Sequence, residues 1–370
     1  MKKSFKLFTF ASALLFAFVV KVNAEECTDN CIAQVGTEKY ATVQEAIAAV
    51  EDGGTIELLA GEFSTEIKTG RINKSFTIVG APNHGTILTG GLSIGTDHSS
   101  KGVQNYTVGV KGIAFKNKGI AVADIRNVNI EDNKLENISG VAAIRVIDPA
   151  IDAVESDVVV KNNIVDGAEQ GIRIRTGYNI EITGNTIKNT NHNSITIEHG
   201  NWSANNGTVV IDNNTFENWA LGGEGRVVRA AFGAATQLEK EIAFTSNKML
   251  REEEPIEEYA KITNVGTTAV DLEKNYWNSD TPDFDKIISV KGGNEEVEIA
   301  EYYKEETMED KDLNTYVEPP KKEETKEETK EEIKEEPNPK TGDNAMLFVI
   351  IGLISSVGTL LVTKKLRTNN

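Results

Sequence analysis

The chain has 370 residues with 57 acidic and 39 basic side chains, which give a formal net charge of -18. Such an acidic balance argues against nucleic acid or an anionic membrane surface as the main partner. The histidines His84, His98 and His192 are too scattered along the sequence to form a metal cluster, so we expect no bound metal and no cofactor.

The N-terminus has the organisation of a secretory signal peptide. Three lysines precede an apolar run over residues 7–20, and residues 22–24 (VNA) then offer the small side chains at which signal peptidase cuts. The run is short for a bilayer, which argues against the alternative of a retained membrane anchor. We therefore predict that residues 1–24 are removed and that the exported chain begins at Glu25.

Residues 25–37 form a separate N-terminal segment that contains both cysteines of the chain, Cys27 and Cys31. In an exported protein such a pair can form a disulfide bond. The loop between the two cysteines is tight, so two free thiols in a frayed end are the alternative interpretation. The sequence leaves both possibilities open.

An internal repeat organises the centre of the chain. Six segments align on a shared asparagine, and each carries apolar residues five and three positions before it and two positions after it. The aligned asparagines are Asn133, Asn163, Asn185, Asn214, Asn247 and Asn275. Apolar alternation at period two predicts a strand with one buried face, and the asparagine that interrupts the alternation predicts a tight turn.

The spacing between successive asparagines varies from 22 to 33 residues. Unequal repeats of short strands exclude a helical solenoid and favour β-coils whose loops vary while their strands stack. Parallel stacking places equivalent residues about 4.8 Å apart, so the six side chains can form a hydrogen-bonded ladder. We interpret these asparagines as structural rather than ligand-binding, because a ladder explains their positions as well as their type.

The two ends of the repeat resemble those of a known group of proteins. The segment YATVQEAIAAVEDGGTIELLAGEF followed by KSFTIVGA resembles the entry, and Asn275-Tyr276-Trp277 the close, of domains in the pectate-lyase-like right-handed parallel β-helix superfamily. The resemblance covers residues 38–303 and implies an all-β, single-stranded right-handed parallel β-helix with a capping helix over residues 42–50. Lyases, hydrolases, esterases, epimerases and non-catalytic adhesins share this fold, so function has to be argued from a site.

A second strand recurs in most coils, at residues 143–147, 171–175, 194–198, 227–231 and 260–262. Its apolar side chains point inward, which leaves an outward row of Arg145, Arg173, Thr196, Arg229 and Lys261, with Arg175, Glu198 and His199 beside it. Cations on neighbouring rungs about 5 Å apart repel by about 1 kcal/mol even in water. The row therefore predicts an anionic ligand or, alternatively, solubilising charges that are paired with acids of nearby loops.

Loops of unequal length border this row. Residues 148–157 and 199–207 follow the second strand and residues 220–226 and 250–258 precede it, so we predict the two walls of a groove whose floor is cationic. Tyr178, Trp202 and Trp219 lie in or beside these loops, and we expect them to stack on sugar rings. A core position is the alternative for Trp219. The loop acids Asp148, Asp152, Glu155 and Asp157 lack the spacing of a calcium site and are typical of a solvated loop.

The C-terminal part of the chain carries a spacer and a three-part signal. Residues 304–337 are rich in Glu and Lys and have no apolar face, so we predict a disordered, solvated spacer. Residues 338–370 combine the pentapeptide NPKTG, an apolar span over residues 345–362 and a basic tail. A plain transmembrane helix would explain the span and the tail but not the pentapeptide.

This order of elements resembles the sortase sorting signal, with Asn338 in the position usually held by Leu. The resemblance implies that a membrane transpeptidase cleaves between Thr341 and Gly342 and joins Thr341 covalently to peptidoglycan. Until cleavage, the apolar span would hold the precursor in the membrane. We therefore expect a secreted protein that is anchored to a Gram-positive cell wall.

Two classes of function fit these features. The first is a wall-anchored adhesion or recognition module that binds acidic polysaccharide, host glycans or wall glycans. The second is a polysaccharide-degrading enzyme, a lyase that acts on uronic-acid chains and uses Ca²⁺ to stabilise the enolate. We favour the first class, because the motifs of hydrolases and esterases with this fold are missing and no catalytic set is complete. The catalytic residues of the second class are therefore unknown.

Overall fold

The computed structural model describes residues 27, 30–95, 103–147, 156–175, 179–199, 206–232, 239–252, 258–266, 270–293 and 297–315. All of them belong to the first of two compact units, which ends at Glu318. Every strand described pairs with another strand of this unit, so its core is complete without the rest of the chain. The unit can therefore be studied as residues 25–318.

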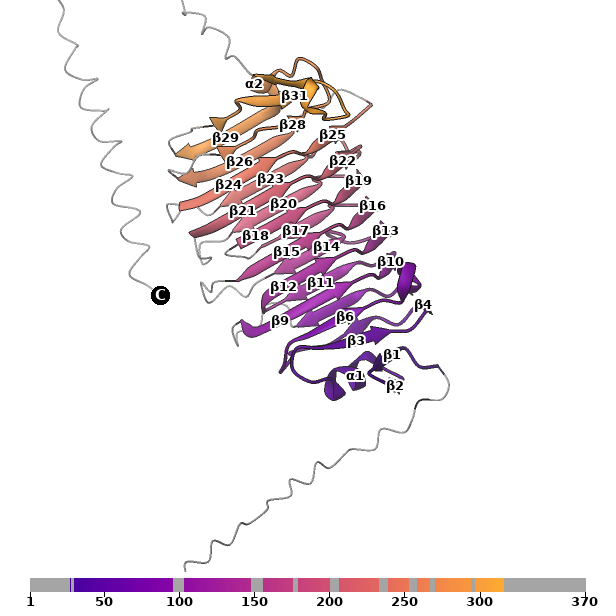
Figure 1. The fold of residues 1–370 in the computed structure, drawn as a ribbon. Helices are drawn as coiled ribbons and strands as arrows, with labels where there is room; N and C mark the ends of the chain where they lie inside the picture. The colour runs from indigo at the N-terminus through magenta and orange to yellow at the C-terminus, as the bar shows by residue number, and fades with distance from the viewer. Residues whose placement is uncertain are drawn as a thin grey trace, which may run out of the picture. The chain divides into compact units, whose positions relative to one another are not determined.

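The fold is a mostly β solenoid in which long stacks of parallel strands form three sheets, compatible with a parallel β-helix (Figure 1). Sheet A contains, in spatial order, β2 (Glu38–Tyr40), β1 (Ala33–Val35), β3 (Gly54–Leu58), β6 (Phe76–Val79), β9 (Gln104–Lys111), β12 (Ile125–Glu131), β15 (Asp157–Lys161), β18 (Asn179–Thr183), β21 (Asn206–Asp212), β24 (Glu239–Thr245), β27 (Val270–Asp271) and β30 (Val297–Glu298). The strands that precede the six aligned asparagines all lie in this sheet.

Sheets B and C complete each coil. Sheet B contains β4 (Gly61–Phe63), β7 (Thr86–Leu88), β10 (Ala114–Lys116), β13 (Lys134–Ile138), β16 (Ile164–Ala168), β19 (Thr186–Thr190), β22 (Thr215–Glu217), β25 (Lys248–Leu250), β28 (Asn275–Tyr276), β31 (Glu301–Tyr303) and β32 (Leu313–Thr315). Sheet C contains β5 (Ile67–Lys68), β8 (Leu92–Gly95), β11 (Ile120–Ala123), β14 (Ile144–Ile147), β17 (Ile172–Ile174), β20 (Ile195–His199), β23 (Val228–Phe232), β26 (Ala260–Gly266) and β29 (Ile288–Gly293). The chain visits sheets A, B and C in turn.

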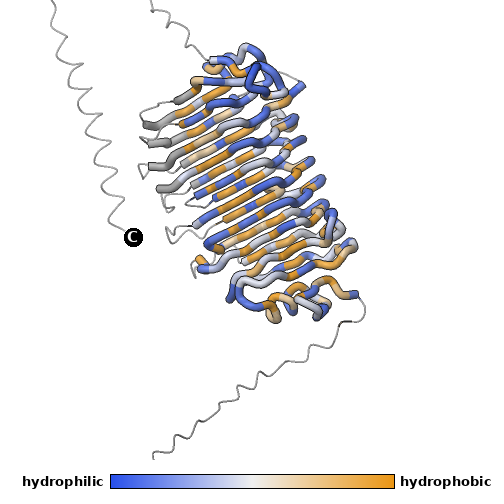
Figure 2. The backbone as a smooth tube through the Cα atoms, in the orientation of Figure 1, coloured by the Kyte–Doolittle hydropathy of each residue, from blue (hydrophilic) through white to orange (hydrophobic). Residues whose placement is uncertain are grey.

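One continuous hydrophobic core fills the solenoid. Equivalent inward positions of sheet A are paired from coil to coil and are at most 2% exposed: Phe76, Val108, Val128, Val158, Ile180, Val209, Ile242 and Val270. Figure 2 shows hydrophobic segments of successive coils lying beside one another. Because a shift of one residue would turn every such side chain outward, this alternation fixes the register of the sheet.

A short helix begins the fold, as the sequence predicts. Helix α1 (Val43–Ala49) starts at a capping box, in which Thr42 Oγ1 accepts from the backbone N–H of Glu45 and the Glu45 side chain accepts from the backbone N–H of Thr42. Val43 and Ala46 are buried against the first strands. A second helix, α2 (Phe284–Ile287), and two 3₁₀ turns, Pro82–His84 and Asp310–Asp312, lie outside the sheets.

The solenoid extends beyond both predicted boundaries. Its first strand begins at Ala33 rather than near residue 38, and its last strand ends at Thr315 rather than near residue 303. Both additions pair antiparallel, β1 with β2 and β3, and β32 with β31. Antiparallel strands lie outside the parallel repeat, so the repeat could not reveal them. They cover sheet edges that would otherwise have unpaired backbone groups.

The N-terminal cysteines form a disulfide bond between Cys27 and Cys31, which resolves the alternative left open by the sequence. The predicted signal peptide, the spacer after Thr315, the pentapeptide with Thr341 and Gly342, and the apolar span lie outside the described residues. Among the helices described, none is long and apolar enough to cross a membrane.

Candidate functional site

The six aligned asparagines form a buried ladder at the corner between sheets A and B. Each of the first five donates from Nδ2 to Oδ1 of the next, at 3.0–3.1 Å. The backbone N–H of each donates to the same Oδ1 at 2.8–3.0 Å. All six residues are at most 1% exposed. Their amides are therefore satisfied by one another and by strand carbonyls and are not available to a ligand.

The residue before each asparagine adopts a left-handed backbone conformation. These residues are Asp132, Asn162, Gly184, Asn213, Ser246 and Lys274, with φ between 53° and 66°. Left-handed residues turn the chain sharply, and Asn, Asp and Gly tolerate this conformation best. Each corner thus consists of two residues: the first, in a left-handed conformation, turns the chain, and the second is the asparagine that hydrogen-bonds in the ladder.

The predicted outward row exists as a register of sheet C. Arg145 of β14 pairs with Arg173 of β17, which pairs with Thr196 of β20. Thr196 pairs with Arg229 of β23, which pairs with Lys261 of β26. We call these five residues the cationic row. Its four cations lie on one face of one sheet, with Thr196 as an interruption.

Glu198 lies beside the cationic row and contacts three arginines. Its Oε2 accepts a hydrogen bond from Arg173 Nη2 at 2.7 Å, and its Oε1 accepts one from Arg229 Nη1 at 3.0 Å. Arg175 Nε lies 3.7 Å from Oε2. The Glu198 side chain is 25% exposed. The arginines are thus partly consumed by an internal ion pair, as the alternative interpretation of the row expected.

The charges of Glu198 and its three arginines, which we call the Glu198 cluster, do not cancel. Three guanidinium groups against one carboxylate leave a net charge of +2. Burial raises the pKa of Glu198, but the hydrogen bonds and charges of Arg173 and Arg229 outweigh it and hold that pKa below its usual value. Glu198 is therefore ionised at neutral pH and still leaves an excess of positive charge on this face.

Thr196 and Arg173 show how closely this face is packed. Thr196 is 1% exposed, although it points outward, because its hydroxyl donates to Gln170 Oε1 at 2.6 Å and accepts from Asn193 Nδ2 at 3.1 Å. Arg173 Nε is buried and has no hydrogen-bond partner among the described residues. One buried donor of the Arg173 guanidinium is therefore left without an acceptor among these residues.

Several predicted site residues cannot be placed. The loops over residues 148–155 and 200–205, with Asp148, Asp152, Glu155 and Trp202, lie outside the described residues, as does Tyr178. His199 ends β20, but its side chain also lies outside what is described. Asp157 is exposed and accepts a hydrogen bond from Asn179 Nδ2 at 2.8 Å. The walls of the predicted groove thus stay a prediction.

The expectation that Trp219 stacks on a sugar is wrong. Trp219 is 1% exposed and packs edge-to-face on Tyr259, with ring centroids 4.9 Å apart. The guanidinium of Arg251 lies 5.5 Å from the centroid of the Trp219 ring, and Arg251 Nη1 donates to the Trp219 carbonyl. This tryptophan fills the end of a coil, which is the alternative that the sequence offered.

Sequence reasoning missed Gln170, Asn193 and the ion pair of Arg226 with Glu258. All four residues precede strands of sheet C, in turns whose conformation the strand pattern does not specify. Arg226 lies two residues before β23, where the alternation of the strand no longer applies, so the sequence offered no signal for its ion pair. Within the described part of the chain, no group of three or more His, Cys, Asp or Glu residues could hold a metal ion.

No known protein family, no characterised protein sequence and no solved structure matches this chain.

Proposed function

We propose that this chain is a surface protein, anchored covalently to the peptidoglycan of a Gram-positive cell, whose solenoid binds acidic glycans along the cationic row. The solenoid would be a right-handed parallel β-helix of the pectate-lyase-like superfamily. One observation carries the binding proposal: three arginines share the single carboxylate of Glu198, so the cluster keeps a charge of +2 in a protein with a net charge of -18.

The geometry of the row suits a polymer better than a small anion. Arg173 and Arg229 lie two strands apart, which is roughly 10 Å in a parallel stack. The length of one sugar residue in an extended polysaccharide is similar to the spacing between neighbouring strands of the sheet. Carboxylates carried on a glycan can therefore meet successive guanidinium groups, and each such contact can be bidentate.

Binding of polyuronates and glycosaminoglycans to residues 25–318 tests the proposal. Replacement of Arg173 by Ala should weaken binding roughly 10- to 150-fold, since a charge-assisted hydrogen bond contributes about 1.5–3 kcal/mol. Replacement by Lys should recover only part of the affinity, because Lys lacks the planar fork of Arg. Added salt should weaken wild-type binding, because screening reduces the attraction.

Lys188→Ala is the matched control, because Lys188 is a cation of sheet B that pairs with Asp166 at 3.2 Å. If Arg173→Ala and Lys188→Ala lost the same affinity for the glycan, binding would depend only on the net charge of the protein. That result would contradict a binding site at the cationic row. The same incubations report lyase activity through the absorbance of unsaturated products. Product formation that Arg173→Ala or Ca²⁺ chelation abolishes would replace the adhesion proposal with the lyase.

Anchoring is tested separately on whole cells. Thr341→Ala should move the protein from the wall fraction to the membrane and medium fractions, because Thr341 would form the bond to peptidoglycan. Thr329→Ala, in the Glu/Lys spacer, is the control and should leave the wall fraction unchanged. A wall fraction that is the same for both variants would contradict the sorting signal.

A further inference from the structure

Strand β29 forms the longest edge of the three sheets, at the C-terminal end of the solenoid (Figure 1). It has six residues, whereas the five other strands at sheet ends have two or three. The antiparallel strand β32 covers the edge of sheet B at this end, but β29 pairs only with β26 among the described strands. An edge strand presents unpaired backbone N–H and C=O groups, to which a strand of another chain can add.

The backbone of Val290 faces this edge. Val290 occupies the position in β29 that Val146 occupies in β14, as the register of sheet C shows. The C=O of Val146 accepts from the N–H of Arg175 in the next coil, at 2.9 Å. In a parallel strand, the N–H and C=O of one residue point to the same side. Both groups of Val290 are therefore directed toward the place of a next coil, where no described strand lies.

The hydrophobic core is less closed at β29 than in the coils before it. Ile288 and Val290 are only partly buried, whereas their partners Ala260 and Ile262 in β26 are at most 1% exposed. A strand added beside β29 would cover both side chains, as each earlier coil is covered by the next, and burial of apolar surface would stabilise it. The edge thus offers apolar side chains as well as backbone groups.

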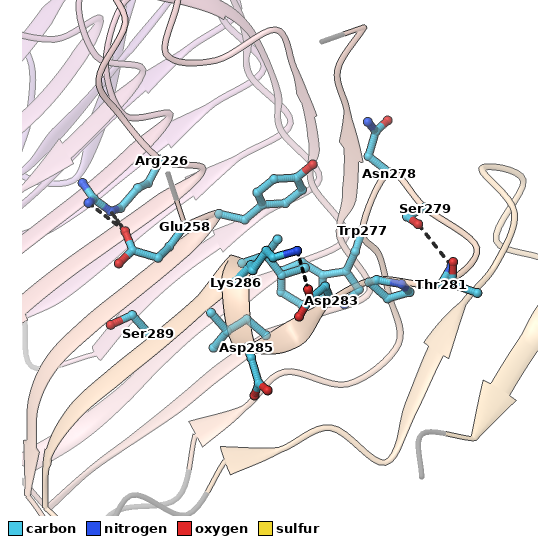
Figure 3. A pocket seen from close by; sticks show the side chains of 14 residues that line it. Arg226, Glu258, Trp277, Asn278, Ser279, Thr281, Asp283, Asp285, Lys286 and Ser289 are labelled. Carbon is cyan, nitrogen blue, oxygen red and sulfur yellow. Dashed lines mark hydrogen bonds and ion pairs between the residues drawn. The ribbon is translucent and has the colours of Figure 1, made fainter. Parts of the chain in front are cut away.

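A cleft of about 810 Å³ lies beside α2 and adjoins the start of β29 (Figure 3). Ile288 and Ser289 belong to its lining, together with residues of α2 and of the segment before it. Small-molecule sites in proteins have volumes of about 300–1,000 Å³. The cleft therefore has room for a long side chain of a segment bound at the edge.

Four of the five charged residues that line this cleft are paired with each other. Arg226 donates from Nε and Nη2 to Glu258 Oε2, at 3.1 and 2.9 Å. Lys286 Nζ lies 2.7 Å from Asp283 Oδ2 (Figure 3). The fifth, Asp285, is exposed and has no hydrogen-bond or ion-pair partner among the described residues. The cleft thus keeps one carboxylate for a cation from outside.

The C-terminal end of the solenoid is acidic as a whole. Residues 278–315 contain twelve acidic and four basic side chains, which give a formal charge of -8. A second copy of the chain would bring two such ends together, and the two would repel each other. The spacer is repelled as well, because residues 318–337 contain nine glutamates and five lysines. The charge of this end therefore favours a basic segment of another protein.

We propose that β29 binds an extended basic segment of a partner protein, which adds to sheet C as a further strand. The N–H and C=O of Val290 pair with the backbone of this segment, and its apolar side chains cover Ile288 and Val290. One of its lysine or arginine side chains enters the cleft beside α2 and pairs with Asp285. The interaction uses neither the cationic row nor its glycan, so it is independent of the proposed function.

Short synthetic peptides of about eight residues test this proposal on residues 25–318. The probe alternates valine and lysine, because successive side chains of a strand face opposite sides. We expect saturable binding that added salt weakens, together with protection of the Val290 amide from hydrogen exchange. A peptide with glutamate in place of lysine should bind about tenfold more weakly, and so should one with N-methyl groups at alternate backbone positions. Equal binding of the three peptides, or no binding of the lysine peptide, would overturn the proposal.

Val290→Pro tests the edge in the protein itself. It removes the N–H that faces the edge and leaves the hydrogen bonds with β26 in place, so it should weaken binding of the lysine peptide about tenfold. Val290→Thr is the matched control, because it keeps both the N–H and the shape of the side chain, and it should bind like the wild type. Wild-type affinity in Val290→Pro would contradict strand addition. The N-methylated peptide tests the same backbone bonds without any change in the protein.

Asp285→Asn tests the cleft and should weaken binding about fivefold, as expected for a partly exposed ion pair. Asp310→Asn is the matched control, because Asp310 is an exposed acid of the same end that does not line the cleft. If both variants lost the same affinity, the peptide would respond only to the charge of the whole end, and the assigned pair with Asp285 would be wrong.

Two further measurements check which segment occupies the edge. Sedimentation that depends on protein concentration would place a second copy of the chain at β29. Protection of the Val290 amide in residues 25–337 without any peptide would place the spacer there. We expect neither result, and either one would refute a basic partner.

Discussion

The asparagine corner and the cationic row both arise from the same parallel stacking, yet they repeat differently. Six identical asparagines follow one another without a break, whereas the cations of sheet C are interrupted by Thr196 and joined through Glu198. An amide both donates and accepts, so identical neighbours satisfy each other. A guanidinium only donates, so identical neighbours repel and need an acceptor between them. A solenoid can therefore repeat an amide indefinitely, but a cation only with a counter-charge or an anionic ligand.

The largest effect should come from breaking the ladder at its centre. Asn185→Leu removes the acceptor of two donors on Asn163 and the donor to Asn214 Oδ1. Because these groups are buried, their loss should lower the free energy of unfolding by about 3 kcal/mol. Chemical denaturation of residues 25–318 measures this difference.

Asn129→Leu is the control for that experiment. Asn129 lies on β12 at an outward, partly exposed position, so it is an asparagine of the same sheet outside the ladder. Its replacement should change stability by no more than about 0.5 kcal/mol. If the two variants were equally stable, the ladder would contribute little and the difference between the two regions would disappear.

A smaller effect is expected on the cationic face. Glu198→Gln keeps the shape of the side chain but removes the charge that three arginines share. We expect a loss of about 1–2 kcal/mol, between the values for exposed and buried ion pairs, because Glu198 is partly buried. Lys161 and Glu181 form a more exposed pair on sheet A, so Glu181→Gln should cost less.

The stability that Glu198 contributes should depend on pH, and the Glu198→Gln variant can measure this dependence. The pKa of Glu198 lies below its usual value of 4.5 in the folded state, so the ionised form stabilises the fold above that pH. The contribution should be constant near neutral pH and should fall as the pH drops below 4.5 toward the folded-state pKa. Unfolding free energies of wild type and Glu198→Gln should thus converge in acid, and a constant difference would contradict the assigned role.

The smallest effect concerns the residue that turns the corner. Ser246 has φ of 54° although it is not a glycine, so Ser246→Gly should stabilise the fold by about 0.5–1 kcal/mol. Gly184→Ala should act in the opposite direction, because its φ is 66° and an added Cβ would collide with Asn162 Oδ1. The midpoint of thermal unfolding should therefore be higher than that of the wild type in Ser246→Gly and lower in Gly184→Ala.

The parts of the fold that repeat could be predicted from the sequence. The six asparagines marked the corner between sheets A and B in six coils, and the period-two pattern located strands of sheets A and C in those coils, because burial on one face leaves a clear alternation. The strands of sheet B were not assigned. Several have only two or three residues, such as β22 and β28, which is too short for an alternation to show.

The candidate site was less accessible to sequence reasoning. The row was predicted because strand positions determine which side chains are neighbours. The sharing of Glu198 was not, because the long side chains of Arg173 and Arg229 reach diagonally to a neighbouring column. The cleft beside α2 was not predicted either, because most of its lining comes from residues 277–289, where the chain leaves the regular repeat to form α2.

The ladder also has a direction. Each of the first five side-chain amides donates from Nδ2 to Oδ1 of the asparagine in the next coil, so these five hydrogen bonds all run in the same direction, toward Asn275. At the start, the backbone N–H of Ile113 covers the first oxygen, and at the end Asn275 donates to the carbonyls of Phe244 and Leu272. Aligned hydrogen bonds polarise one another. The hydrogen bonds of the ladder therefore strengthen one another, so replacement of an interior asparagine should lower the free energy of unfolding more than replacement of a terminal one.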